Sequence, residues 1–465
     1  MTRYLENFFQ GGDQIISLAA VFAVWIALSV IGGAIGGRER IRQIDHLIGW
    51  SVVSLILTGG GVLTRIPFTY LTIGAGVLAL VSGSVLWRRG DGIGSKSWAR
   101  LLILGLPFFA LLSAMRGSQW DEFTDWLVIP RYLLETDAFP SHDNPYANAN
   151  LLAYPYSWHF ITYMASRLGS RFLENAGAIS NVLLLFGFGL LTLRLIGRGL
   201  GRENLAHAPT WGLAALAGLS TTLFNPTFAQ KVALTAYADT SSAVVTGTAV
   251  ILGWLMVEAL ADGDPRLARR YAWQTGAVLL VLINLKQATL VLTVLVIGGI
   301  IITALREPRI KGSALATTLP AVIVPPLLIA LVWRYHVATE IDAGELRIMA
   351  FADWHVALIP DIVGRMLLVL SKKGLYLAVI TLVAILGLRG LVRSRSSFDR
   401  FALIAAAVVF GYNAFLLFAY VTTFGEFDAL RAASYWRYNM HLGLVCVAFA
   451  AVGLTEIWRK RLAGR

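Results

Sequence analysis

Thirteen stretches of mainly apolar residues recur along this chain, and their repetition limits the fold more than any other feature of the sequence. They lie near residues 15–36, 47–66, 69–87, 99–115, 176–196, 209–224, 239–260, 272–285, 287–305, 314–333, 374–392, 400–421 and 437–457. An α-helix needs about 20 such residues to cross the hydrocarbon core of a bilayer. Only helices and closed barrels satisfy their backbone polar groups in lipid. The pattern therefore predicts an all-α integral membrane protein with about 13 transmembrane helices.

The composition favours the same class of protein. Of the 465 residues, 57% are hydrophobic and 14% are charged, whereas a soluble domain carries about 25% charged residues. The net charge of +12 would suit a nucleic-acid partner, but the Lys and Arg residues lie in short segments between apolar runs. This distribution is typical of membrane topology, so we expect no nucleic-acid partner. The single cysteine, Cys446, lies in an apolar run, so an intrachain disulfide is excluded.

Alternating charge along the connections predicts the orientation. Basic clusters follow the first, third and fifth runs and every second run after that, up to the tail at 458–465. The remaining connections are acidic or mixed, and the longest of them are 116–175 and 334–373. Because cytoplasmic loops collect Lys and Arg, we expect the N-terminus outside, the C-terminus in the cytoplasm and both long loops facing outward. The protein would then lie in the inner (plasma) membrane of a bacterium. Residues 1–13 show no cleavage-site pattern, so we expect no removable signal peptide.

Two stretches test this alternation. Residues 151–168 are long enough to cross, but a crossing there would invert every later loop. Their tyrosines and tryptophan are typical of a helix lying on the outer membrane surface. Residues 272–285 and 287–305 are separated by a polar break, which predicts a helical hairpin. One long helix is the alternative.

The polar segment 116–160 holds the main catalytic candidates. If its first part is helical, Asp121 and Asp125 lie on one face, with Glu122 beside them. Like charges this close to a bilayer are unfavourable unless they bind a cation or one holds a proton. One carboxylate is therefore a candidate general base, and its neighbours can orient an acceptor. The sequence requires no cofactor, but these three carboxylates suit a divalent cation such as Mg²⁺, Mn²⁺ or Ca²⁺. An ordinary solvated loop is the alternative.

Three cations are candidates for binding a phosphate at the outer face. Lys286 lies in the polar break next to Gln287, and the alternation places it at an outward turn. A lysine whose ammonium only reaches the headgroups is the alternative. Arg437 begins the last apolar run on the outer side and needs an anionic partner, either a phosphate or a structural carboxylate. Lys231 lies in the outward loop 225–238.

Further polar and aromatic residues of the outward segments are candidates for substrate binding. They are Tyr154, His159, Tyr237, Asp239 and Tyr438, together with Asp125 and Gln287. His159 has no metal-ligand spacing. The loop 334–373 suits a lid over an outward site, and a mobile loop with an amphipathic piece at 357–370 is equally consistent with it.

Several of these features together resemble the GT-C superfamily of polytopic glycosyltransferases. The features are the Asp121-Glu122 pair, the Tyr154-Pro155 stretch, the Asn284-Leu285-Lys286-Gln287 break and the Arg437-Tyr438 pair. Members such as aminoarabinose transferases and protein O-mannosyltransferases use polyprenyl-phosphate-linked sugars. The resemblance covers about residues 99–457, and residues 1–98 look like additional transmembrane helices. Where the family usually has a second proline, this chain has Tyr156.

The resemblance implies an inverting hexosyl- or pentosyltransferase of the cell envelope. It implies that Asp121 deprotonates the acceptor, that Glu122 is its partner, and that Lys286 and Arg437 neutralise the leaving lipid phosphate. Lys231 would add to that charge. The acceptor would be an envelope lipid, glycan or protein. The alternative function is a flippase of lipid-linked sugars or another polytopic transporter, although no paired halves with matching broken helices are evident. A non-catalytic partner of an envelope assembly is a further alternative.

Overall fold

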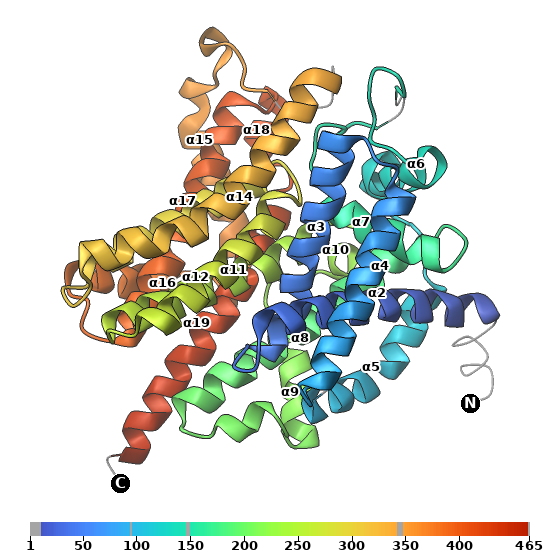
Figure 1. Ribbon diagram of the computed structural model, residues 1–465. Coiled ribbons are helices and arrows are strands. Elements are labelled where there is room, and N and C mark those ends of the chain that lie inside the picture. The colour runs from blue at the N-terminus through green and yellow to red at the C-terminus, as the bar shows by residue number, and fades with distance from the viewer. Residues whose placement is uncertain (1–10, 94, 146–148, 342–346, 464–465) are drawn as a thin grey trace, which may run out of the picture.

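The fold is a bundle of helices, seen in a computed structural model that describes residues 11–93, 95–145, 149–341 and 347–463 (Figure 1). The longer helices are α2 (Gly12–Gly36), α3 (Asp45–Thr64), α4 (Phe68–Arg88), α5 (Lys96–Ala114), α6 (Val128–Thr136), α7 (Ser157–Leu168), α8 (Ala176–Gly199), α9 (Trp211–Thr221), α11 (Asp239–Ala261), α12 (Pro265–Ile283), α13 (Thr289–Arg306), α14 (Gly312–Glu340), α15 (Ile359–Ser371), α16 (Gly374–Val392), α17 (Ser397–Thr422) and α19 (Tyr435–Ala463). The described residues contain no strand. Residues 342–346 of the expected lid lie outside the described residues.

Twelve helices of the described chain are long and apolar enough to cross a membrane. This confirms a multi-pass integral membrane protein. The twelve differ from the thirteen predicted stretches at three places. Helix α9 has only 11 residues, α12 begins with a segment that carries three arginines, and residues 351–371 qualify by hydropathy although the sequence predicted a polar loop there. The predicted break between 272–285 and 287–305 is confirmed, since α12 ends at Ile283 and α13 begins at Thr289.

The connections fall into two groups at opposite ends of the bundle, as the alternating charge predicts. At the basic end, ion pairs join residues that lie in or beside different connections. They are Arg42 to Asp91, Arg270 to Glu39, Arg309 to Asp262, and Arg400 to Glu307. At the other end, ion pairs join Arg65 to Glu340, Arg167 to Asp137, and Arg171 to Asp13. We call the second group the acidic end. It holds the segments 116–175 and 423–434 and the start of α19.

Helix α9 covers only part of the length of the bundle, and an irregular segment completes the path. A Cβ at Gly189, in the middle of α8, would lie 2.2 Å from the carbonyl oxygen of Ala217 in α9. The segment 222–238 then continues to the acidic end, where Asn181 donates to the carbonyl oxygens of Thr235 and Tyr237 at 3.0 Å each. Irregular backbone at membrane depth is tolerated where protein surrounds it.

Helix α7 does not lie on the membrane surface. Residues 157–166, ten of its 12 residues, are buried among α2, α3, α6 and α8. The expectation of an interfacial helix is therefore wrong. Aromatic side chains suit both an interface and a protein core, and here Trp158 donates its indole N–H to the carbonyl oxygen of Ala236 at 2.6 Å. A helix of 12 residues is also too short to cross a bilayer.

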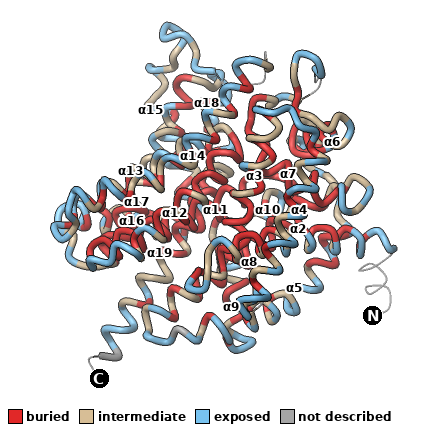
Figure 2. Tube along the Cα trace, viewed as in Figure 1, coloured by how far each residue is buried: buried red, intermediate tan, exposed pale blue. Residues whose placement is uncertain are grey.

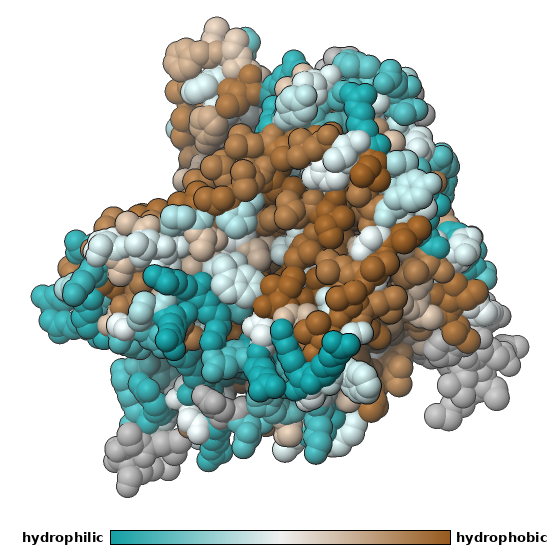
Figure 3. Space-filling view, in the orientation of Figure 1, coloured by the Kyte–Doolittle hydropathy of each residue, from teal (hydrophilic) through white to brown (hydrophobic). Residues whose placement is uncertain are grey.

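Helix α11 forms the centre of the bundle. The membrane-length window of α11 is 100% buried, and Figure 2 shows it as a continuous buried core surrounded by partly exposed helices. Hydrophobic side chains cover a broad area of the surface in Figure 3, with hydrophilic residues below this area and at the upper right. Because α11 is buried along its length, polar side chains at its two ends are buried at the two ends of the bundle.

Candidate active site

The candidate site is built around Asp239, the first residue of α11, whose side chain is 0% exposed. Its Oδ1 accepts from the Lys286 Nζ at 3.0 Å and lies 2.8 Å from Nε2 of His441. Its Oδ2 accepts from Arg437, at 3.1 Å from Nε and 3.0 Å from Nη2. The start of a helix also favours a negative charge. One buried carboxylate therefore holds three nitrogen-bearing side chains in place.

Two breaks in the helical structure supply these partners. Lys286 lies in the turn between α12 and α13, is 5% exposed, and its Nζ is 3.0 Å from Nε2 of His441. Arg437 and His441 lie one helical turn apart at the start of α19, so both face α11. The hydroxyl of Tyr412, on α17, lies 2.9 Å from Nδ1 of His441 and fixes the imidazole from its other side. Burial lowers the pKa of Lys286.

Asp121 lies at the outer edge of this cluster. Arg437 donates through Nη1 to its carboxylate, which is 35% exposed. The guanidinium of Arg437 lies over the ring of Tyr237, 4.2 Å from the centroid. The backbone N–H of Asp121 donates to the Tyr237 hydroxyl at 3.3 Å, and burial raises the pKa of Tyr237 to about 12. Arg437 thus bridges a buried carboxylate and a partly exposed one.

Glu122 points away from Asp121 and binds backbone groups. Its carboxylate accepts from the N–H groups of Ser118 at 2.8 Å, Gln119 at 3.0 Å and Ala236 at 2.7 Å. The side chain is buried, and the bond to Ala236 joins the polar segment 116–160 to the segment that precedes α11. Both carboxylate oxygens of Glu122 are therefore already engaged by backbone N–H groups, and they are not free to assist Asp121 as a base. This geometry fits a structural role better than the expected catalytic one.

Asp125 is also held away from Asp121. It accepts from the hydroxyl of Thr124 at 2.8 Å and from the backbone N–H of Leu151 at 2.8 Å, and burial raises its pKa. The predicted helix is instead a π-helical turn, Glu122–Trp126 (η2), so the i, i+4 spacing of an α-helix does not apply. Among the described residues no three His, Cys, Asp or Glu side chains are grouped to hold a metal ion. The three carboxylates therefore do not converge on one cation.

The other predicted substrate residues divide between the cluster and its surroundings. Tyr154 is buried and interacts electrostatically with Tyr438 and Arg437, and burial raises its pKa. Tyr438 is half-buried, with its ring centroid 6.2 Å from that of His441. Gln287 is half-buried next to Lys286. Lys231 is exposed in the short helix α10 (Gln230–Ala233), and no ion pair found among the described residues joins it to Asp239.

His159 lies in the core behind the loop. Its ring stacks on Trp126 with 5.3 Å between centroids and packs edge-on against Tyr156 at 5.3 Å. Burial lowers its pKa to about 3. A histidine held neutral in this way supports the wall of the site and does not fit a contact with substrate.

This burial predicts a pH-dependent stability. Between the ordinary histidine pKa of about 6.5 and the folded value of about 3, the unfolded chain binds a proton that the folded chain does not. The free energy of unfolding should therefore fall as the pH falls below 6.5, by about 1.4 kcal/mol per pH unit from this residue. In detergent denaturation series from pH 7 to 4.5, His159→Phe should give a shallower slope than the wild type. An unchanged slope would contradict the neutral, buried state of His159.

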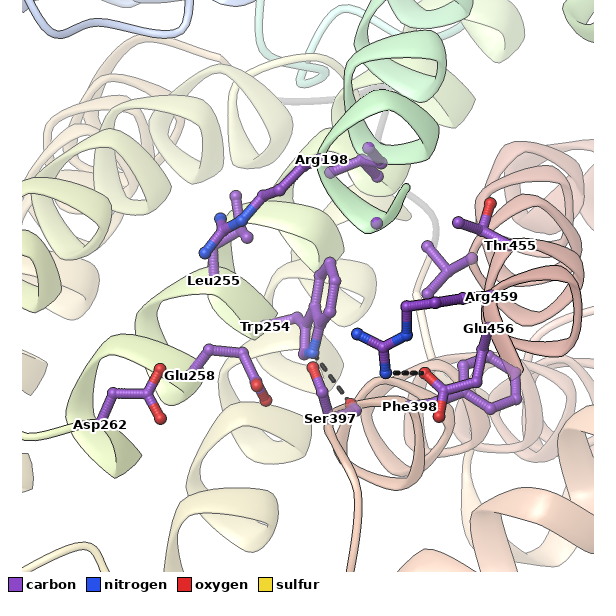
Figure 4. A pocket seen from close by; sticks show the side chains of 13 residues that line it. Arg198, Trp254, Leu255, Glu258, Asp262, Ser397, Phe398, Thr455, Glu456 and Arg459 are labelled. Atoms are coloured by element: carbon purple, nitrogen blue, oxygen red, sulfur yellow. Dashed lines mark hydrogen bonds and ion pairs between the residues drawn. The ribbon is translucent and has the colours of Figure 1, made fainter. Parts of the chain in front are cut away.

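A cavity of about 200 Å³ lies at the opposite end of α11 and α19 from the Asp239 cluster. Figure 4 shows Arg198 extending from the top and Arg459 from the right, where it pairs with Glu456, while Glu258 and Asp262 lie at the lower left. Because Glu258 and Asp239 are 19 residues apart on one helix, this cavity lies about 28 Å from the Asp239 cluster. Arg400 already pairs with both Glu258 and Glu307. The cavity therefore belongs to the basic end and not to the candidate site.

Sequence reasoning left His441 out of the site and did not find Tyr412. The position of His441, four residues after Arg437, indicates that both side chains lie on one face of a helix, and this spacing could have placed His441 in the site. Tyr412 lies in an apolar stretch and gives no such signal. No protein-family model, curated protein or solved structure matches the chain.

Proposed function

We propose that the protein is an inverting glycosyltransferase of the GT-C type that transfers a sugar from a polyprenyl-phosphate donor to an acceptor of the cell envelope. One observation carries the proposal: Arg437 links the partly exposed carboxylate of Asp121 to the buried cluster of Asp239, Lys286 and His441. A base that meets solvent and a set of fixed cations behind it are the two groups that such a transfer needs.

The arrangement supports a defined role for Asp121. Asp121 pairs with Arg437, and an ionised carboxylate is the form that accepts a proton. Asp121 takes the proton of the acceptor hydroxyl while the acceptor oxygen bonds to the anomeric carbon. The bond between that carbon and the phosphate oxygen breaks, and the phosphate leaves with the electron pair. Attack from the face opposite the leaving group gives inversion.

Arg437 and Lys286 are the proposed groups that stabilise the leaving phosphate. Both side chains are already held by hydrogen bonds to carboxylates, so they need little reorganisation during the reaction. Their charges are balanced in the resting protein by Asp239 and Asp121. Protonation of Asp121 during attack removes one negative charge beside Arg437. The cation is then available to the phosphate at the moment when that phosphate gains charge.

The proposed topology places this chemistry at the outer face. Thirteen segments run between the two ends of the bundle if α12 and α9 with residues 222–238 are counted and 351–371 is not. Odd crossings from an outside N-terminus then put the basic end in the cytoplasm. The donor lipid would enter from the outer leaflet, and the acidic end would face the cell envelope.

The direct test uses purified protein in nanodiscs and a polyprenyl-phosphate pentose or hexose labelled in the sugar. The proposal expects free polyprenyl phosphate and labelled product only when an envelope glycan or lipid acceptor is present. Absence of both products with every acceptor class would contradict it.

A transporter of lipid-linked sugar is the second candidate function. It is favoured by the buried polar network of Asp239, Lys286, His441 and Tyr412 inside the bundle, because buried ionisable groups often mark transport pathways. In proteoliposomes a transporter would move intact donor to the opposite leaflet without releasing its sugar. Donor movement without cleavage would favour this function over transfer.

A further inference from the structure

A separate cavity of about 540 Å³ opens at the acidic end of the bundle. It lies between the turn that joins α3 to α4, residues 138–144 and the last turn of α14. Typical small-molecule pockets occupy about 300–1,000 Å³. None of the residues that line this cavity belongs to the Asp239 cluster. Its size alone therefore allows a ligand of its own.

Positively and negatively charged side chains surround the cavity. Arg65 donates to the carboxylate of Glu340 at 2.7 Å, and its Nη1 lies 3.9 Å from Asp143. Arg65 has a left-handed backbone, with φ of 54°, a conformation that non-glycine residues rarely adopt. Two carboxylates and one guanidinium leave a net negative charge. This balance disfavours a phosphate or another anion as the ligand.

A buried histidine and two aromatic side chains form part of the cavity wall. His336 lines the cavity, is 6% exposed, and its Nε2 has no hydrogen-bond partner among the described residues. Buried polar atoms normally find a partner. Phe139 and Tyr335 add aromatic surface to the same cavity. Carboxylates, an amide and the exposed ring of Tyr335 together match a ligand that carries hydroxyl groups around a ring with apolar faces.

A wall of side chains separates this cavity from Asp121. The indole of Trp333 donates to the carbonyl oxygen of Ala153 at 2.9 Å, and its ring lies 4.9 Å from that of Tyr156. Tyr156 in turn packs on His159, whose ring stacks on Trp126 of η2. The cavity and the candidate site are therefore separate, with this wall between them.

We infer that this cavity binds a neutral oligosaccharide. Carboxylate, amide and hydroxyl groups such as Glu340, Asn144 and Ser141 exchange hydrogen bonds with sugar hydroxyls, and the aromatic rings pack against the apolar faces of the sugar. The identification of this oligosaccharide as the non-reacting part of the acceptor rests on the proposed function. The binding itself does not. A free glycan and a glycolipid headgroup share this chemistry.

The test compares two tryptophan variants on the exposed face at the end of α14. Thr339→Trp fills the cavity from an exposed position that lines it, and Ala338→Trp adds the same side chain at the neighbouring exposed position, which does not line it. The probes are mannotetraose and arabinotetraose, each free and as its octyl glycoside, titrated into full-length protein by calorimetry. We expect Thr339→Trp to weaken binding at least about tenfold and Ala338→Trp to change it less than about twofold.

A second variant keeps the shape of the cavity. Glu340→Gln removes the charge that holds Arg65 and should weaken binding by about three- to tenfold at unchanged thermal stability. Equal binding by free and octyl glycosides indicates a glycan site, and binding by the octyl forms alone indicates a glycolipid site. Failure of both tetrasaccharides to bind wild-type protein, or equal binding by both tryptophan variants, overturns the inference. Binding without sugar transfer would refute the proposed function alone, and transfer without binding would refute this inference alone.

Discussion

Replacing Asp121 with asparagine is expected to lower sugar transfer by about 10²–10⁴-fold, the range for loss of a general base. The asparagine oxygen can still accept the hydrogen bond from Arg437, so the cluster should keep its shape. The amide cannot take the proton of the acceptor. Donor binding should therefore persist while turnover is lost. The measurement is initial rate with labelled donor, beside donor affinity measured without acceptor.

Two matched variants separate the loss of a base from the loss of structure. Glu135→Gln removes an exposed carboxylate from α6 in the same segment, 116–175, and should keep wild-type turnover. Glu122→Gln should lower thermal stability, because its buried carboxylate binds three backbone N–H groups. The protein that stays folded should keep most of its turnover. Wild-type turnover by Asp121→Asn would remove Asp121 as the base.

The main residues of the site were predictable because membrane burial makes charges rare. Asp121, Asp239, Lys286 and Arg437 stand out in an apolar chain, because two of them interrupt apolar runs and the other two begin one. Their pairing was not predictable. Asp239 and Arg437 are 198 positions apart, and nothing local to either residue indicates the other.

The predictions that differ from the structure also have physical causes. The sequence analysis placed the aromatic helix α7 on the membrane surface because tyrosine and tryptophan are favoured both at interfaces and in polar parts of a core. It placed Asp121, Glu122 and Asp125 together because it assumed α-helical spacing, whereas the chain forms a π-helical turn. It also did not pair Lys286 with a carboxylate, whereas the folded chain places Asp239 of α11 beside it. Tertiary contacts decide each of these cases.

Removing the charge of Asp239 should destabilise the protein more than any other single substitution at the site. Asp239→Asn leaves the ammonium of Lys286 buried beside Arg437 and His441 without its carboxylate. Breaking a buried ion pair in this way costs about 3–5 kcal/mol. We expect a loss of this size in the free energy of unfolding, measured by denaturation in detergent micelles. Asp262→Asn, at the exposed end of the same helix, should change it by less than about 0.5 kcal/mol.

The double variant Asp239→Asn/Lys286→Met tests whether the unpaired charge causes that loss. Methionine is similar to lysine in length and carries no charge, so the uncompensated ammonium disappears together with its partner. Replacing both members of a buried pair is often nearly neutral, and we expect the double variant to regain more than half of the lost stability. Strictly additive losses would show instead that Asp239 and Lys286 act independently. Recovery of stability without recovery of transfer would indicate that the same pair that holds the fold together also serves the leaving phosphate.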